Sequence, residues 1–477
     1  MMTTTTLSSI NSQYVDSLAG RGEPGWLAAM RKQAFSQYES LPAEVSPLYS
    51  KYSDVNKIKP TSVHLANAQQ PRPANLSKDL NDRLKELEQE KTGILQVGPE
   101  ISRIFLRDSL AKQGVVVSGI RDALKNHEDV VKAHMNANQL NYLEDKFLAL
   151  EASAFQSGVF IYIPRNVVLE DPIRIITSLA DDGTSLISHN VIVADTGSKA
   201  TVVQELYAPG ASGRQDVQQG YFELVETYVN PNAHLELVTL QAMGADTINV
   251  SNRKAFVERD AKMSWYIGMF GSLLSRYKTD SIMKGPGASA EDVEIIFGIA
   301  NQSFDVTSNL IHHGQHSRGR VLVKSVLKDT SKSLFKGMIK IGKGGKGTES
   351  YLAGHAILLD RGAKSDSIPG LEIETNEVKA THSASVAQID ENQIYYLTTR
   401  GLSREGAKRE IVNGFLEPLS RRMGPTIRAW VNYLIENKWQ SRPLMLRTDE
   451  AMEQILEVEK SRYRETQDIF EKHYKYR

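Results

Sequence analysis

Three histidines lie within five consecutive residues, at His312, His313 and His316. On a helix His312 and His316 would share one face, and on a strand alternation would also put them on one face. A metal site needs three or four ligands, and the nearest acid upstream is Asp305. The spacing therefore makes His312 and His316 candidate metal ligands, with structural or surface histidines as the alternative.

A further histidine, His382, stands alone in residues 378–385 (VKATHSAS). By pattern alone, a single histidine at such a place is more often structural than functional. The chain has no cysteine at all. This excludes thiolate catalysis, disulfides, Cys-ligated zinc and an iron–sulfur centre held by this chain alone.

The segment that must position these histidines reads as strand after strand, from about residue 158 to about residue 373. Short runs rich in Val, Ile, Phe and Tyr alternate with turns of small residues, and successive turns lie about 27 to 35 residues apart. No helical segment is long enough for a parallel crossover. A large sandwich, a propeller or a β-helix remain, and the missing Trp-Asp blade signature and the period favour the β-helix, which needs a cap at each end.

Helical patterns flank the strands on both sides. Asp390 is a candidate N-cap, Gly401 ends the helix that follows, and Ser403 caps a second helix with an apolar stripe. The predicted division is an N-terminal helical domain (1–150), a β-helix core (151–386), a C-terminal helical domain (387–440) and a helical extension (441–477). His382 then lies where the strands give way to helices.

Charge and hydropathy limit the classes of partner. The 57 basic and 57 acidic residues cancel, which disfavours a nucleic-acid binder. No apolar run approaches the roughly 18 residues of a membrane span. The N-terminus is a polar Thr/Ser run without the pattern of a signal peptide, so we expect a cytoplasmic protein with no membrane contact.

Several segments together resemble the SufB/SufD family. The longest is residues 381–397 (THSASVAQIDENQIYYL), and the others are residues 23–27 (EPGWL), 155–165 (FQSGVFIYIPR), 335–339 (FKGMI), 369–373 (PGLEI), 400–403 (RGLS) and 411–415 (IVNGF). The resemblance spans roughly residues 20 to 440. The His-Ser-Ala form at His382 and the absence of cysteine resemble the SufD members more than the SufB members.

The resemblance implies a non-catalytic scaffold subunit for iron–sulfur cluster assembly, with a right-handed parallel β-helix flanked by helical domains. In that family the β-helices of SufB and SufD pair, and their C-terminal helices each hold the ATPase SufC. The implied partners are a SufC-like ABC ATPase and either a SufB-like subunit or a second copy of this chain. The implied partner-binding residues lie in the C-terminal helices: Tyr395, Arg400, Gly401, Arg404, Lys408 and Phe415.

The resemblance also makes His382 the candidate cluster ligand. Many SufD sequences carry a cysteine two residues before this histidine, but here the position is Ala380. Imidazole can replace thiolate on some irons, so His382 could ligate a transient cluster that a partner completes. We expect no cluster to be bound stably by this chain alone.

Two other functions fit the same strand pattern. One is a β-helical carbohydrate-active lyase or hydrolase, whose paired carboxylates the sequence alone cannot locate. The other is an architectural homodimer without metal contact.

Overall fold

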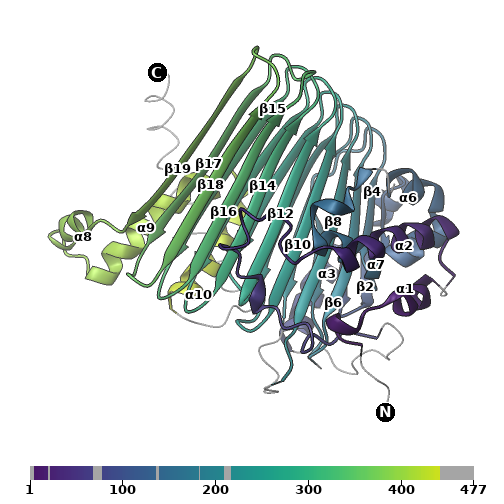
Figure 1. The fold of residues 1–477 in the computed structure, drawn as a ribbon, viewed down its shortest axis with the longest axis horizontal. Coiled ribbons are helices and arrows are strands. Elements are labelled where there is room, and N and C mark those ends of the chain that lie inside the picture. The colour runs from purple at the N-terminus through teal and green to yellow at the C-terminus, as the bar shows by residue number, and fades with distance from the viewer. Residues whose placement is uncertain are drawn as a thin grey trace. The chain divides into compact units, whose positions relative to one another are not determined.

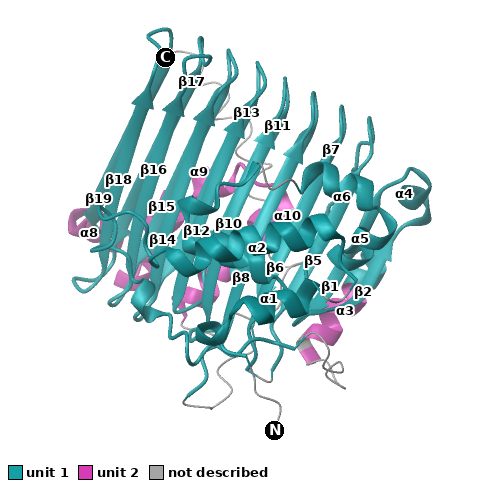
Figure 2. Cartoon of the chain, turned by 45° about the vertical axis from the view of Figure 1, so that its right-hand side comes forward, with its two compact units in different colours: residues 1–74, 87–389 teal, residues 75–86, 390–477 magenta. Residues whose placement is uncertain are grey.

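The computed structural model describes residues 5–19, 22–67, 78–135, 139–181, 183–208 and 216–440. The chain divides into two compact units: unit 1 comprises residues 1–74 and 87–389, and unit 2 comprises residues 75–86 and 390–477 (Figure 2). Every strand of the described residues belongs to unit 1.

Unit 1 is built on a β-helix whose strands form two sheets (Figure 1). The first sheet has ten strands in the order β19 (Lys379–Gln388), β17 (Glu349–Leu358), β15 (Arg318–Leu327), β13 (Ser289–Gly298), β11 (Lys262–Met269), β9 (His234–Ala242), β7 (Lys199–Tyr207), β5 (Ile173–Ser178), β1 (Thr92–Val97) and β2 (Glu100–Leu106). The second has nine strands in the order β18 (Lys364–Ile373), β16 (Lys332–Ile341), β14 (Ser303–His312), β12 (Leu274–Met283), β10 (Ile248–Val257), β8 (Gly220–Val229), β6 (Leu186–Ala194), β4 (Val159–Ile163) and β3 (Val116–Gly119). All neighbouring strands from β4 to β19 pair in parallel, which confirms the predicted β-helix.

One turn of this β-helix, a rung, contributes one strand to each sheet. The number of residues per rung follows from the register, because the first residues of β7 to β19 in the first sheet align with one another. In the first sheet the rung length ranges from 27 residues, between Lys262 and Ser289, to 35 residues, between Lys199 and His234. This range equals the turn spacing read from the sequence.

The small residues of the turns have a conformational cause. At the corner where the second sheet leads into the first, one residue per rung has left-handed backbone: Asn232 (φ 59°), Asp260 (φ 54°), Gly287 (φ 70°), His316 (φ 55°) and Gly347 (φ 73°). Glycine adopts this region freely, and Asn and Asp tolerate it better than most residues. The turn signature therefore marks one corner of the β-helix.

Three helices cover the outer face of the second sheet: α1 (Ser12–Ala19), α2 (Gly25–Ser40) and α7 (Lys146–Ala154) (Figures 1 and 2). Apolar side chains such as Leu27, Phe35 and Leu148 form one core cluster with Phe222 and Leu274 of the sheet. Burial against the sheet stabilises these helices, so they belong to the same unit as the strands. A separate N-terminal helical domain over 1–150 is therefore not what the structure shows.

The N-terminal 150 residues also contribute β1, β2 and β3, which the sequence analysis missed. β2 pairs with β1, and β3 pairs with β4, both antiparallel, at the start of the two sheets. Short helical segments lie nearby in the chain: η1 (Leu7–Ser9), η2 (Val55–Lys57), α4 (Asp108–Lys112), α5 (Ile120–Asn126), α6 (Glu128–His134) and η4 (Tyr142–Glu144). There β2 and β3 reverse the strand direction and end the parallel stack, and we call them the cap; each of them pairs on one edge only.

Unit 2 contains the C-terminal helices α8 (Glu391–Thr398), α9 (Arg404–Ser420) and α10 (Pro425–Trp439), and α3 (Lys78–Glu90) begins in it. Their predicted caps are confirmed: Asn392 N–H donates to Asp390 Oδ1 (2.8 Å), and Gly406 N–H donates to Ser403 Oγ (3.0 Å). Gly401, with φ 92°, follows α8. The predicted extension over 441–477 lies outside the described residues. Among the helices that are described, none is long and apolar enough to cross a membrane.

Candidate functional site

The last rung, made of β18 and β19, ends the β-helix at the side opposite the cap. Within the described residues, each of these strands pairs on one edge only, with β16 and β17 respectively. Unpaired strand edges are templates for pairing with another chain. At the other end β2 and β3 also pair on one edge only, but they run antiparallel to their neighbours, so the two ends of unit 1 differ in strand direction.

His382 lies on β19 in this open rung. The register places it opposite Leu352 of β17, which in turn lies opposite Val321 of β15. Leu352 and Val321 are fully buried in the core, so His382 occupies the next position of an inward-facing column. Its side chain is exposed only because no further rung follows. Thr381 and Ser383 alternate to the outer face.

The last rung also exposes apolar side chains at other inward-facing positions. Leu371 and Ile373 of β18 are 40% and 41% exposed, and Val386 of β19 is 43% exposed. All three align with inward-facing positions of the preceding rung: Ile339, Ile341 and Ala356. The open end thus presents His382 in a rim of Leu371, Ile373 and Val386, and exposed apolar groups of this kind are typical of a protein–protein interface.

The free edge of β18 cannot pair with another strand along its whole length. Lys364 N–H donates to Ser331 O (3.1 Å) and Glu374 N–H to Ile341 O (2.9 Å), so the even-numbered amides face β16. The odd-numbered positions face the open edge, and position 369 is proline, which has no N–H. Pro369 therefore removes a donor from the free edge of β18.

β19 has no such interruption. Lys379 N–H donates to Thr348 O and Ile389 N–H to Leu358 O, both at 2.9 Å, so the odd-numbered amides face β17. The even-numbered amides, including those of His382 and Ala384, face the open edge. β19 contains no proline. Of the two unpaired edges, the edge of β19 is the one that can pair with an additional strand along its whole length.

A second histidine of this region faces outward. His355 of β17 has Nδ1 2.7 Å from Ser385 Oγ of β19. Partial burial and the nearby Lys324 lower the pKa of His355. His355 and His382 thus lie on neighbouring strands but on opposite faces of the sheet.

The structure does not bring His312 and His316 together. His312 ends β14 and is buried, with Nδ1 2.8 Å from Ser317 Oγ and Nε2 3.0 Å from Ser350 Oγ. Burial, with a smaller contribution from His313, lowers the pKa of His312 to about 4. Both ring nitrogens of this neutral imidazole are engaged by hydroxyl groups.

His316 lies in the turn after β14 and is exposed. Its left-handed backbone places the imidazole beside Gly347 of the next rung, where an added Cβ would lie 2.3 Å from Nδ1. The expectation of a shared face is wrong, because β14 ends at His312 and the chain turns before His316. In the described part of the chain, no group of three or more His, Asp and Glu side chains could hold a metal ion.

Unit 2 places the predicted partner-binding residues in a helical hairpin. Tyr395 and Tyr396 of α8 are 72% and 56% exposed, and the Arg400 guanidinium lies 3.4 Å from the centre of the Tyr396 ring. Leu402, beside Gly401, is 39% exposed. The hairpin therefore presents a compact aromatic and apolar surface.

Two more of the predicted contact residues have partners within the hairpin. Arg404 donates to both carboxylate oxygens of Glu391, at 2.6 and 2.8 Å, and so joins α9 to α8. Lys408 pairs with Glu405 (3.2 Å), and its side chain is only 17% exposed. Phe415 is half-buried. Tyr395, by contrast, is 72% exposed.

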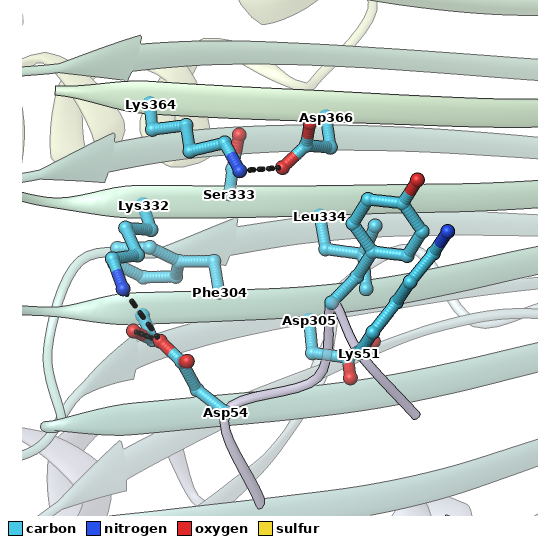
Figure 3. Close-up of a pocket in the computed structure, with 11 residues that line it drawn as sticks. Lys51, Asp54, Phe304, Asp305, Lys332, Ser333, Leu334, Lys364 and Asp366 are labelled. Atoms are coloured by element: carbon cyan, nitrogen blue, oxygen red, sulfur yellow. Dashed lines mark hydrogen bonds and ion pairs between the residues drawn. The ribbon is translucent and has the colours of Figure 1, made fainter. Parts of the chain in front are cut away.

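A pocket of about 100 Å³ lies between residues 51–54 and the starts of β14, β16 and β18 (Figure 3). Lys364 pairs with Asp366 (3.0 Å), and Lys332 lies 3.8 Å from Asp54 (Figure 3). The third carboxylate, Asp305, accepts from Ser53 Oγ (2.9 Å) and pairs with Lys336 (2.7 Å). The Ser53–Asp305 and Lys332–Asp54 contacts attach residues 51–54 to the sheet, and each of the three pocket carboxylates has a partner.

The open rim could be foreseen only in part from the sequence. Leu371, Ile373 and Val386 were missed, because apolar residues in a strand are ordinarily read as core. The available signal was the period, since these residues belong to the last repeat before the helices and no later repeat can cover their inward faces.

Comparison with known proteins agrees with this architecture. Residues 176–415 match the family described as SUF system FeS cluster assembly, SufBD core domain, and residues 11–175 match the SufBD protein N-terminal region. The chain is 29% identical over 427 residues to the iron–sulfur cluster assembly protein SufD of Bacillus subtilis (strain 168), covering 88% of this chain and 95% of that protein. It is 25% identical over 422 residues to an iron–sulfur cluster assembly SufBD family protein of Staphylococcus epidermidis (strain ATCC 12228 / FDA PCI 1200), covering 87% of this chain and 89% of the relative. The chain therefore belongs to the SufBD family of iron–sulfur cluster assembly proteins, and it is similar to SufD over most of its length.

Proposed function

We propose that this chain is a non-catalytic, SufD-like scaffold subunit that pairs through its open rung with a second β-helical chain. The partner is a SufB-like subunit or a second copy of this chain. The observation that carries the proposal is the exposed apolar rim of the last rung, beside the unpaired edge of β19.

In the proposed assembly, His382 donates a ring nitrogen to an iron–sulfur cluster formed at the paired ends. The position supports this role, because the imidazole sits at the unpaired edge and faces the end of the core. The chain has no cysteine, so the partner supplies the remaining ligands. A cluster held by few ligands from each side suits a scaffold that must release it.

The hairpin of α8 and α9 is the proposed docking site for a SufC-like ATPase. Tyr395 supports this assignment, because it is 72% exposed on the first helix and aromatic residues are enriched at interfaces. The Arg404–Glu391 pair keeps the two helices together, so we assign Arg404 a bracing role and not a direct contact.

The proposal is tested by anaerobic purification from the native cell, with identification of the co-purifying chains and analysis of iron and sulfide. We expect a SufB-like chain or a dimer of this chain, together with an ATPase, and cluster in the assembled complex. The isolated chain after reconstitution should hold no stoichiometric iron and sulfide. A monomeric chain that retains a cluster by itself would contradict the proposal, and cleavage of a polysaccharide in a carbohydrate screen would favour the enzyme alternative.

A further inference from the structure

The middle of the β-helix interior is polar. Glu223 of β8 and Arg253 of β10 are fully buried and form an ion pair (2.5 Å). The Arg253 guanidinium also donates to Ser251 Oγ (2.9 Å), Thr239 Oγ1 (2.7 Å) and Gln204 Oε1 (2.9 Å). The same guanidinium lies 5.2 Å from the centre of the Tyr277 ring of β12, in the next rung.

Two more carboxyl groups lie in the same interior, on β13. Asp292 and Glu294 are two residues apart, so both face inward, and they are 1% and 0% exposed. Ser308 Oγ of β14 donates to Glu294 Oε1 (2.7 Å). Asp292 Oδ1 and Glu294 Oε2 receive no hydrogen bond from any donor group in the described residues.

Asp292 and Glu294 are neighbours on the inner face of β13, and each has one buried oxygen without a donor. An ionised carboxylate is only an acceptor, so two carboxyl groups can share a hydrogen bond only when one of them carries a proton. The charged and titratable groups facing the pair do not remove this need. Arg253 is matched by Glu223, Tyr277 of β12 donates its hydroxyl to Asn249 Oδ1 (2.6 Å), and Glu291 is on the outer face of β13. Two adjacent carboxylates without a cation of their own cannot both ionise in a buried site.

Apolar side chains separate the pair from the open rung. Asp292 aligns with Val321, which aligns with Leu352, and only then follows His382. Glu294 aligns with Val323, which is 1% exposed. The pair thus has no polar connection along these columns to the end of the β-helix.

We propose that Asp292 and Glu294 share one trapped proton in the native β-helix, and that this proton makes the stability of the fold depend on pH. Burial raises the pKa of both groups, and the interaction of the two carboxyls raises that of Glu294 further. The folded chain then keeps a proton that the unfolded chain releases above the ordinary carboxyl pKa of about 4. Stability therefore falls as the pH rises from this value to the raised pKa of the pair, and levels off above it.

The test is denaturant unfolding of the full chain between pH 5 and pH 9 in four proteins. One bound proton changes the unfolding equilibrium constant by about tenfold per pH unit. Glu151 of α7 is another buried carboxyl with a raised pKa, so the wild-type slope alone does not identify the pair. In Glu294→Gln, the change of the unfolding equilibrium constant per pH unit should be smaller than in the wild type by a factor of up to ten. Asp292→Asn should have the same effect. Glu291→Gln, an outward acid on the same strand, should leave the slope unchanged.

Infrared spectroscopy supplies a readout that needs no change to the pair. Glu151→Gln at pH 7 should still show the carbonyl stretch of a buried protonated carboxyl group, because the pair remains intact. The absence of that band would overturn the proposal, even if the pair variants do not fold. Equal pH slopes for the wild type, Glu294→Gln and Asp292→Asn would overturn it as well.

Discussion

The apolar rim of the open rung gives a quantitative prediction for partner binding. Leu371, Ile373 and Val386 each have about two fifths of their surface exposed. Burying a whole Leu, Ile or Val side chain contributes about 1.5–3 kcal/mol, so covering the exposed part contributes about 0.6–1.2 kcal/mol for each. The three together contribute about 2–3.5 kcal/mol if a partner covers them.

Replacing all three residues with serine should therefore weaken pairing roughly 30- to 400-fold. A single Leu371→Ser change should weaken it about three- to eightfold. The assays are sedimentation velocity for self-pairing and a binding titration with a separately purified SufB-like chain. Because these side chains also contribute to the core, thermal unfolding of each variant must be measured in parallel.

Ile104 provides the matched control for this experiment. It lies on β2, at the opposite end of the first sheet from β19, and is 40% exposed, as Leu371 of β18 is. Ile104→Ser removes a similar apolar area from the opposite end of unit 1, so it should leave pairing unchanged. Equal pairing by the wild type and the triple serine variant, with both folded, would refute the assignment of the open rung as the interface.

Three more predictions concern single side chains. Ala384→Pro removes an amide that faces the open edge, so it should weaken pairing with a partner chain while the chain stays folded. Ala387→Pro removes an amide that faces β17, so it should instead lower the melting temperature. Tyr395→Ser should reduce capture of the ATPase in a pull-down by about tenfold or more, the usual effect of losing an aromatic anchor, without changing the melting temperature. His312 has a pKa lowered to about 4 in the folded chain, so its contribution to stability is lost as the pH falls from about 6.5 through 4. His312→Gln should therefore reduce the loss of stability in acid, as measured by unfolding at several pH values. An unchanged dependence of stability on pH would contradict the buried neutral imidazole.

The strands and their period were predictable because each signal is local. Val159–Ile163 is a run of apolar residues bounded by turn residues, and it forms β4 with these bounds. The turn spacing reports rung length directly, since every rung must return the chain to the same corner. Asp390, Gly401 and Ser403 likewise act on adjacent backbone, so their caps could be placed without knowledge of the fold.

The parts that sequence reasoning missed depend on long-range register. β1 and β3 are short strands among helices, and their pairing with β5 and β4 is set by segments far along the chain. The direction of His382 follows from its alignment with Leu352, thirty residues earlier, and not from its polar neighbours. Alternation along β13 does not tell which face is inward, and only the register with Val321 and Val323 shows that Asp292 and Glu294 face the core.

The ligand role of His382 is tested most directly by measuring iron and sulfide in the assembled complex after anaerobic reconstitution. The comparison is between His382→Ala and His355→Ala, which remove imidazoles from the inner and outer faces of the two last strands of the first sheet. Both variants should fold and pair, and His382→Ala should cost within about 1 kcal/mol of stability, because its side chain is exposed. We predict that the His382→Ala complex loses most of its iron and sulfide, while the His355→Ala complex keeps the wild-type content. Wild-type iron and sulfide in a folded, paired His382→Ala complex would contradict the ligand role.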